Sequence, residues 1–193
     1  GHEEARLIYQ GVSRLLPQSD ERRLVIDIGG RSTEMILGQG YEARAMESYR
    51  LGSVAWSGRY FPKGVCTTGA FKTAEVAAKA VLDEALDTFT PGQWDVAYGS
   101  SGTVGAVADI LGANGWPVGT VSRAGLDWLV ERMVRTGQVD QLRLEGLKDD
   151  RRPVLAGVVG ALATATRPTG LAVMPALLLL SFERSGVLTA VRA

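Results

Sequence analysis

Two carboxylates flank a short polar loop near the start of the chain. Asp27 interrupts the apolar run of residues 24–28, where an unpaired ionised carboxylate is costly, so we expect it at a strand end beside a cation or hydrogen-bond donors. Glu34 follows the loop and opens a second apolar run. A hairpin of this kind bends backbone amides around an anion and brings both carboxylates near a hard metal ion. Because an isolated Asp-x-Gly is more often a plain turn, the prediction depends on the wider pattern.

A second turn of small residues follows the strand predicted at residues 94–98. The turn consists of Gly99, Ser100, Ser101, Gly102 and Thr103. It precedes an Ala/Val/Ile-rich helix, and such a turn aims backbone amides outward from the helix N-terminus, where an anion is favoured. Close packing between the helix and the strand explains the same small residues equally well.

The composition excludes several classes of protein. The chain has 193 residues, 46% of them apolar, and 21 basic residues balance 21 acidic ones. Zero net charge provides no field that would attract nucleic acid or a membrane, so any anion site must be built locally. The single cysteine, Cys66, allows no internal disulfide and is expected to be a buried apolar residue rather than a nucleophile. A cytoplasmic protein fits these features best.

Both ends of the sequence carry expectations of their own. The apolar stretch 171–182 is about half of the ~20 residues that a membrane helix needs and contains Pro175, so we expect it to be core. No leader with a charged and then an apolar segment is present. Gly1 and His2 are typical of a cloning remnant, which predicts that the natural sequence is interrupted just before Glu3.

Hydrophobic periodicity and turn residues predict a single α/β domain over residues 1–193. Strands are expected at residues 24–28, 33–37, 42–51 and 94–98, the first three joined by tight turns. Helices are expected at residues 3–12, at 71–89, from the second turn to residue 111, at 122–135 and at 149–165, with Ser122 as an N-cap. Residues 171–191 are expected to add a strand and a last helix.

The segment LVIDIGGRSTEMILG at residues 24–38 resembles the hallmark of the exopolyphosphatase / guanosine pentaphosphate phosphohydrolase (Ppx/GppA) family. Five further motifs agree in type and order: EEARLIYQGV at 3–12, SYRLGS at 48–53, YFPKG at 60–64, GSSGT at 99–103 and DDRRPVLAG at 149–157. Chance similarity of a single loop does not explain ordered motifs that cover most of the chain.

The resemblance implies the second of two actin-like domains. The implied fold is a ribonuclease-H-like α/β domain of the actin / sugar kinase / heat-shock-70 superfold, with a five-stranded mixed sheet flanked by helices. The implied activity is Mg²⁺-dependent removal of terminal phosphates from inorganic polyphosphate or (p)ppGpp, and a homodimer is a further expectation. The family's first domain, domain I, carries its own phosphate loop, which this sequence lacks, so the isolated domain is expected to be slow or inert.

Family roles transfer to this sequence by position. Glu4 matches the catalytic glutamate, a general base for the attacking water, although a glutamate that only complements the helix dipole is the alternative. Asp27 and Glu34 match positions that hold Mg²⁺. The implied phosphate-binding residues are Gly29, Gly30, Arg31, Ser32 and Thr33 in the first loop, the turn from Gly99 to Thr103, Arg50 and Arg151.

Two departures from the family pattern keep other functions open. Arg31 replaces the third glycine of the loop, where it either strains or blocks the site or adds a bidentate phosphate contact. Residues 180–186 lack the Asp-Gly of the family's C-terminal motif, which is typical of a diverged or non-catalytic member. A non-catalytic module that binds polyphosphate or an alarmone is therefore an alternative. A kinase is a third hypothesis, against which the order of the EEAR, DIGG and STE motifs argues.

Overall fold

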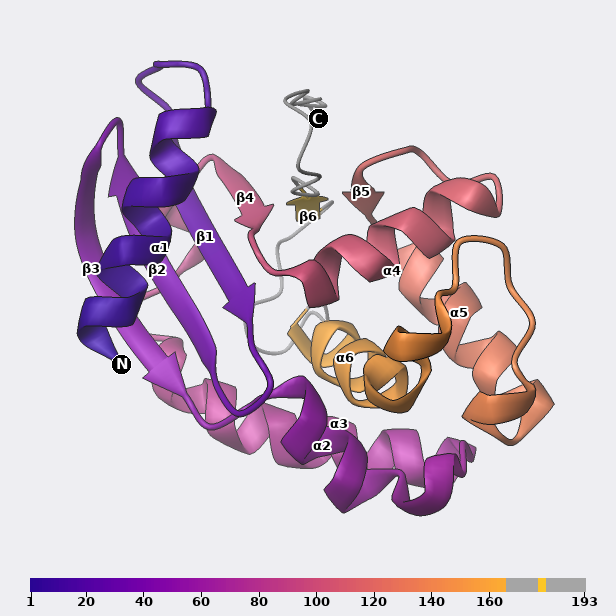
Figure 1. Ribbon diagram of the computed structural model, residues 1–193. Coiled ribbons are helices and arrows are strands. Elements are labelled where there is room, and N and C mark those ends of the chain that lie inside the picture. The colour runs from indigo at the N-terminus through magenta and orange to yellow at the C-terminus, as the bar shows by residue number, and fades with distance from the viewer. Residues whose placement is uncertain (166–176, 180–193) are drawn as a thin grey trace.

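Three antiparallel strands near the start of the chain form the part of the sheet that carries the first loop (Figure 1). In the computed structural model, which describes residues 1–165 and 177–179, helix α1 (His2–Leu15) precedes β1 (Arg22–Ile28), β2 (Thr33–Gln39) and β3 (Glu42–Tyr49). β1 pairs with β2 and β2 with β3, both in antiparallel register. These three strands and their antiparallel arrangement confirm the sequence prediction.

The remaining strands extend the sheet on the other side of β1. β4 (Val96–Gly99) lies parallel to β1, β6 (Leu177–Leu179) lies parallel to β4, and β5 (Thr120–Val121) pairs antiparallel with β6. The strand order is β3-β2-β1-β4-β6-β5. The mixed α/β sheet confirms the predicted class. Within the described residues the sheet has six strands and not the predicted five, because the two-residue strand β5 was not expected.

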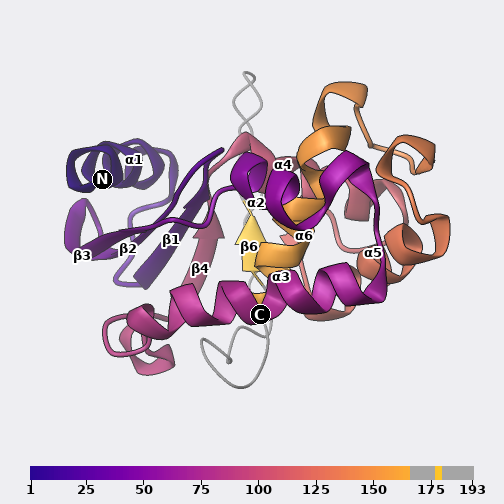
Figure 2. The same cartoon turned by 90° about the horizontal axis from the view of Figure 1, so that it is seen from below.

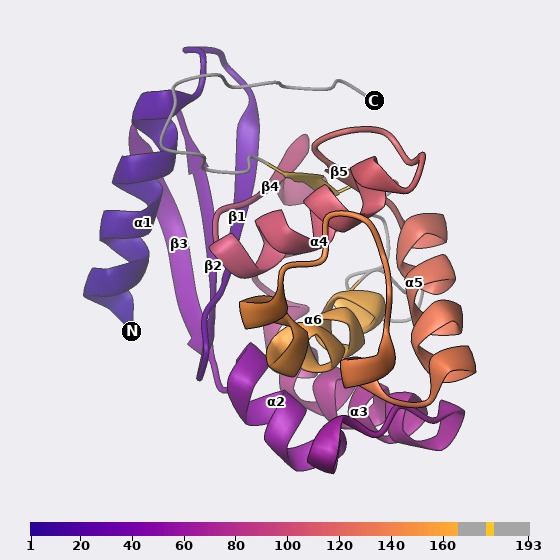
Figure 3. The ribbon, with the colours of Figure 1, turned by 45° about the vertical axis from the view of Figure 1, so that its right-hand side comes forward.

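Helices cover the two faces of the sheet unequally (Figures 2 and 3). Alternate side chains of a strand point to opposite faces, and in β1 residues 24, 26 and 28 enter the larger core whereas Val25 enters a smaller core under α1. The larger core is shared with α2 (Ser53–Tyr60), α3 (Thr68–Leu82), α4 (Gly102–Ala113), α5 (Arg123–Thr136) and α6 (Arg152–Ala165). The face under α1 is the one that Asp27 shares with Val25.

Most predicted helices form close to their expected bounds. Ser122 caps α5 as predicted, accepting a hydrogen bond of 3.1 Å from the amide of Gly125. Helix α2 was not predicted, because it has only eight residues and begins without a side-chain cap. Short 3-10 turns occupy Pro62–Gly64, Asp83–Ala85, Pro91–Gln93, Val139–Gln141 and Asp149–Arg151. Strand β6 lies within the expected 171–191 segment, while the rest of that segment, including residues 180–186, lies outside the described residues.

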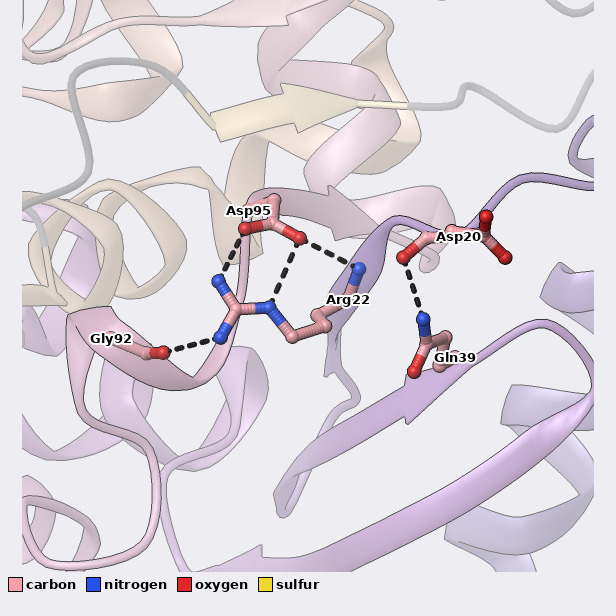
Figure 4. Close-up of polar contacts among 5 residues, drawn as sticks. All are labelled: Asp20, Arg22, Gln39, Gly92 and Asp95. Atoms are coloured by element: carbon pink, nitrogen blue, oxygen red, sulfur yellow. Dashed lines mark hydrogen bonds and ion pairs between the residues drawn. The ribbon is translucent and has the colours of Figure 1, made fainter.

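An ion pair fixes the end of the sheet opposite to the first loop (Figure 4). The guanidinium of Arg22 contacts both carboxylate oxygens of Asp95 at 2.5 and 3.1 Å, and the Arg22 amide donates to the same carboxylate at 2.9 Å. A further bond of 2.6 Å runs from Arg22 to the carbonyl of Gly92. These contacts join the start of β1 to the segment that leads into β4.

Two remaining expectations concern Cys66 and the membrane. Cys66 is 1% exposed, and burial raises the pKa of its thiol to about 11, which agrees with a buried apolar role. Within residues 1–165 and 177–179, none of the helices combines the length and the apolar character needed to cross a bilayer.

Candidate functional site

A row of four polar residues crosses the sheet at the carboxyl end of β1. Asp27 is the cross-strand partner of Glu34, and Glu34 is in turn the partner of Ser48 on β3. On the other side, Ser100 directly follows β4 and donates its hydroxyl to Asp27. We call Ser48, Glu34, Asp27 and Ser100 the polar row.

The polar row lies on the face of the sheet that α1 covers. Val25, Ile36 and Tyr98 each lie two positions along the chain from a member of the polar row, namely Asp27, Glu34 and Ser100 respectively. Their side chains belong to the smaller core under α1. Because side chains two apart on a strand share a face, α1 and the polar row are on the same side of the sheet.

Each carboxylate of the row accepts a hydrogen bond from one serine. The Ser100 hydroxyl lies 2.5 Å from Oδ2 of Asp27, and the Ser48 hydroxyl lies 2.7 Å from Oε1 of Glu34. Glu34 is only 2% exposed. Within the described part of the chain, no basic side chain forms an ion pair with either carboxylate, so two buried or half-buried acids lie side by side without a cation.

The electrostatics of Asp27 reflect this arrangement. Burial raises the pKa of Asp27 above its ordinary value, the hydrogen bond from Ser100 partly opposes that rise, and the charges of Glu34 and Glu4 add to it. A positive charge placed beside Asp27 would lower that pKa again. Glu4 is distant from Asp27 in the sequence, but its charge is close enough to raise the pKa of Asp27.

Glu4 reaches the site because of the direction of α1. The helix begins at the same end of the sheet at which β1 ends (Figure 1), and Glu4 lies in its first turn. Its carboxylate is exposed and lies 3.7 Å from the terminal ammonium of Gly1. The structure thus brings the three predicted acidic residues, Glu4, Asp27 and Glu34, to one end of the sheet.

The first loop is held by the start of α2. The carbonyl of Gly29 accepts bonds from the amide and hydroxyl of Ser53 at 2.9 and 3.0 Å. The carbonyl of Gly30 accepts from the amides of Val54 and Ala55 at 3.0 and 3.1 Å. In these contacts the first amides of α2 donate to protein acceptors, and the direction of the loop carbonyls is fixed. An anion must therefore be bound by other groups of the loop.

Not every predicted donor of the first loop is free. The Gly29 amide donates to the carbonyl of Ser32 at 2.9 Å, and the Thr33 hydroxyl donates to the carbonyl of Leu51 at 2.5 Å. Thr33 is 3% exposed, so its hydroxyl serves the fold of the loop. Within the described residues, the amides of Gly30, Arg31 and Ser32 and the Ser32 hydroxyl have no protein acceptor, which leaves them available to an anion.

Arg31 fits the loop without strain. Among the described non-glycine residues only Lys63 has a positive φ, so the position of Arg31 does not require a glycine. Its side chain is exposed. Arg50, at the end of β3, is also exposed, and neither guanidinium has a hydrogen bond or ion pair in the described part of the structure.

The second turn combines a helix N-terminus with a cation. Ser101 caps α4 by accepting from the Val104 amide at 3.2 Å. The Arg151 guanidinium lies over Gly102, such that a β-carbon there would be 3.3 Å from Nη2. The same guanidinium pairs with Asp150 at 3.4 Å. Positive charge beside helical amides favours an anion. Phosphate binding by Arg151 and by the turn stays a prediction.

The donor set suits a hydrated hard cation more than a fully protein-bound one. Within the described ranges, no three or more His, Cys, Asp or Glu side chains are grouped closely enough to bind a metal ion. Mg²⁺ typically uses one or two carboxylates, keeps several waters and takes further ligands from substrate phosphates. The neighbouring carboxylates of Asp27 and Glu34 meet that requirement.

Ser48 is the member of the site that sequence reasoning missed. It appeared only as the first residue of the SYRLGS segment. A single serine in a predicted strand is a weak signal. Its importance follows from the register that places it opposite Glu34.

The sequence comparisons show the family. The Ppx/GppA phosphatase family matches residues 1–167. A guanosine-5'-triphosphate,3'-diphosphate pyrophosphatase of Vibrio atlanticus is 42% identical over 151 residues, covering 78% of this chain and 30% of the relative. The protein of the same name from Aeromonas hydrophila is 37% identical over 187 residues, covering 97% of this chain and 34% of the relative. The chain thus spans about a third of the length of these curated relatives.

Solved structures share the fold. A type II variant of the Aquifex aeolicus Ppx/GppA phosphatase superposes with a TM-score of 0.75 at 20% identity, over 92% of this chain and 58% of that one. An exopolyphosphatase from Cytophaga hutchinsonii gives 0.72 at 21% identity, over 93% and 59% of the respective chains. These similarities confirm the predicted α/β fold of the actin-like kind.

Proposed function

Because the chain belongs to the Ppx/GppA phosphatase family, we propose that it forms one wall of a site that hydrolyses terminal phosphoanhydride bonds. The observation that carries this proposal is the cross-strand pair of Asp27 and Glu34, with Glu4 acting on Asp27 from α1. Three acids at one end of the sheet lie beside two loops that offer free amides and a guanidinium. That combination suits a metal-bound phosphate chain.

The proposed chemistry assigns one task to each group. Glu4 accepts a proton from a water molecule as the water oxygen bonds to the terminal phosphorus and the bridging P–O bond breaks. Asp27 and Glu34 would hold Mg²⁺, which, when bound, would neutralise charge on the phosphoryl oxygens and on the departing oxygen. The free amides of the first loop and the Arg151 guanidinium orient the phosphates. The bridging oxygen keeps the electron pair of the broken P–O bond, and the shortened phosphate chain leaves with that negative charge.

The substrate class follows from the relatives. The two curated relatives are named for guanosine-5'-triphosphate,3'-diphosphate, so guanosine pentaphosphate is the first candidate and inorganic polyphosphate the second. We further propose that residues 1–193 are the second domain of a longer enzyme, because the chain covers only 30% and 34% of those relatives. A first domain would then supply the opposite wall.

The test compares two adjacent glutamates. In the longer enzyme, Glu4→Gln is expected to lower phosphate release from guanosine pentaphosphate and polyphosphate by about 10²- to 10⁴-fold, the usual contribution of a general base. Glu3→Gln is the matched control, because the Glu3 carboxylate binds Arg6 at 2.6 and 2.9 Å. An undiminished rate in Glu4→Gln would exclude its role as base.

The same assay addresses the non-catalytic alternative. If the unmodified longer enzyme releases no phosphate while calorimetry shows micromolar binding of polyphosphate or guanosine tetraphosphate, the chain belongs to a binding module. Rapid turnover excludes that alternative. Phosphoryl transfer that requires a nucleotide donor would instead support a kinase.

A further inference from the structure

We propose that Ser48 and Ser100 are positioning residues, which orient the Glu34 and Asp27 carboxylates for a divalent cation. The inference rests on the cation site of the proposed function and assigns the two serines a role distinct from phosphate binding. Strand order β3-β2-β1-β4 makes them the outer members of the polar row, with the two acids between them.

The hydroxyl of Ser100 has a fixed direction. Its amide donates to the carbonyl of Ile26 at 3.0 Å, which holds the residue beside the end of β1, and its hydroxyl lies 2.5 Å from Oδ2 of Asp27. An ionised carboxylate can only accept, so the serine supplies the proton. A hydroxyl has one proton, and Ser100 therefore cannot donate to a phosphate at the same time.

Ser48 repeats this relationship on the other side of the row. As the cross-strand partner of Glu34 it donates to Oε1 at 2.7 Å. Glu34 is 2% exposed, so few other donors can reach that oxygen. Each serine thus restrains one carboxylate oxygen, and within the described residues Oδ1 of Asp27 and Oε2 of Glu34 have no protein donor.

Restraint of this kind affects cation affinity. A carboxylate that rotates freely must lose that freedom when it binds a metal ion, whereas a hydrogen-bonded one has lost it already. Removing a group that orients a metal ligand typically costs about 10- to 100-fold in metal affinity. Because Mg²⁺ would have only two carboxylate ligands here, the orientation of each one matters.

The experiment measures Mn²⁺ binding to the 193-residue chain, with Mn²⁺ as a paramagnetic substitute for Mg²⁺, by electron paramagnetic resonance of the free ion. Ser100→Ala and Ser48→Ala are each expected to weaken binding by about 10-fold or more. Ser100→Thr and Ser48→Thr keep the hydroxyl and are expected to restore most of the affinity. Ser13→Ala is the control, because this buried serine donates to Gln10 within α1.

Asp27→Asn separates the possible outcomes. If Asp27→Asn abolishes Mn²⁺ binding while both alanine variants bind as the unmodified chain does, the positioning role is wrong and the cation site stands. If Asp27→Asn also leaves binding unchanged, the cation site of the proposed function is itself wrong. If the alanine variants lose binding and the threonine variants do not restore it, the loss reflects general damage to the fold and the proposal is wrong. Circular dichroism of each variant checks independently whether the fold is intact.

Discussion

The backbone of Arg31 lies directly against Gly52: a β-carbon at Gly52 would be 2.2 Å from the carbonyl carbon of Arg31. Gly52 has φ −109° and ψ 149°, which any residue adopts, so this position requires glycine for lack of space. The contact presses the first loop onto the start of α2. The first loop and the helix that holds its carbonyls are therefore one packed unit.

This contact predicts that Gly52→Ala destabilises the protein by about 3 kcal/mol, the upper part of the range for overpacking, because backbone atoms cannot move aside as a side chain can. Urea unfolding measures the change. Gly58→Ala, within the helix that Gly52 precedes, is the control, since nothing lies within 4 Å of its added carbon. That variant is expected to gain roughly 0.5–1 kcal/mol from better helix propensity. Equal effects of the two substitutions would contradict the proposed packing.

Arg31 is predicted to assist phosphate binding. Arg31→Ala and Arg31→Gly are both expected to weaken polyphosphate binding by about 10-fold, since each removes one charge-assisted contact. The free energy of unfolding of Arg31→Gly is expected to be roughly 0.4–1 kcal/mol lower than that of Arg31→Ala, because the position does not need a positive φ. Calorimetry and urea unfolding give the two quantities. Tighter binding by Arg31→Gly would show instead that the arginine blocks the loop.

Two neighbouring hydroxyls are predicted to behave differently. Thr33→Val is expected to cost about 1–3 kcal/mol of stability, because it leaves the buried carbonyl of Leu51 without its donor. Ser32→Ala is expected to change stability by less than about 0.5 kcal/mol and to weaken phosphate binding. Thermal and urea unfolding, with calorimetry for the ligand, distinguish these roles. A stable Thr33→Val that no longer binds phosphate would return Thr33 to the site.

The ion pair at the far end of the sheet predicts a pH-dependent contribution to stability. Hydrogen bonds from the Arg22 side chain, and then from its backbone amide, lower the pKa of Asp95. A lowered carboxyl pKa contributes stability above the ordinary pKa, and this contribution is lost as pH falls through the lowered value. Asp95→Asn should reduce the melting temperature at pH 7 by no more than about 3 °C, because the pair is solvent-exposed.

The pH profile provides the check on that assignment. The difference in melting temperature between the unmodified chain and Asp95→Asn is expected to be constant from about pH 8 to pH 5 and to shrink below about pH 4. A difference that persists at the lowest pH would assign the effect to packing instead of charge.

The sequence by itself determined most of the elements and where the first loop lies between them. Short extended runs, the first of them apolar and β-branched, and the turn residues between them located the first three strands, and the carboxylate inside an apolar run marked Asp27 as unusual. These features are local, since a strand's period and a turn's composition depend on residues next to one another. The short helix α2 and the strand β5 gave too few residues for a periodic signal.

Only the tertiary structure decided which groups lie together and which hydrogen bonds each one makes. Ser48, Glu34, Asp27 and Ser100 meet because of strand register and order, and register depends on pairing between segments that are distant in the chain. Neighbouring hydroxyls look equivalent in a sequence. A hydroxyl has a single proton, and the acceptor that folding places beside it, Leu51 for Thr33 and Asp27 for Ser100, decides how that proton is used.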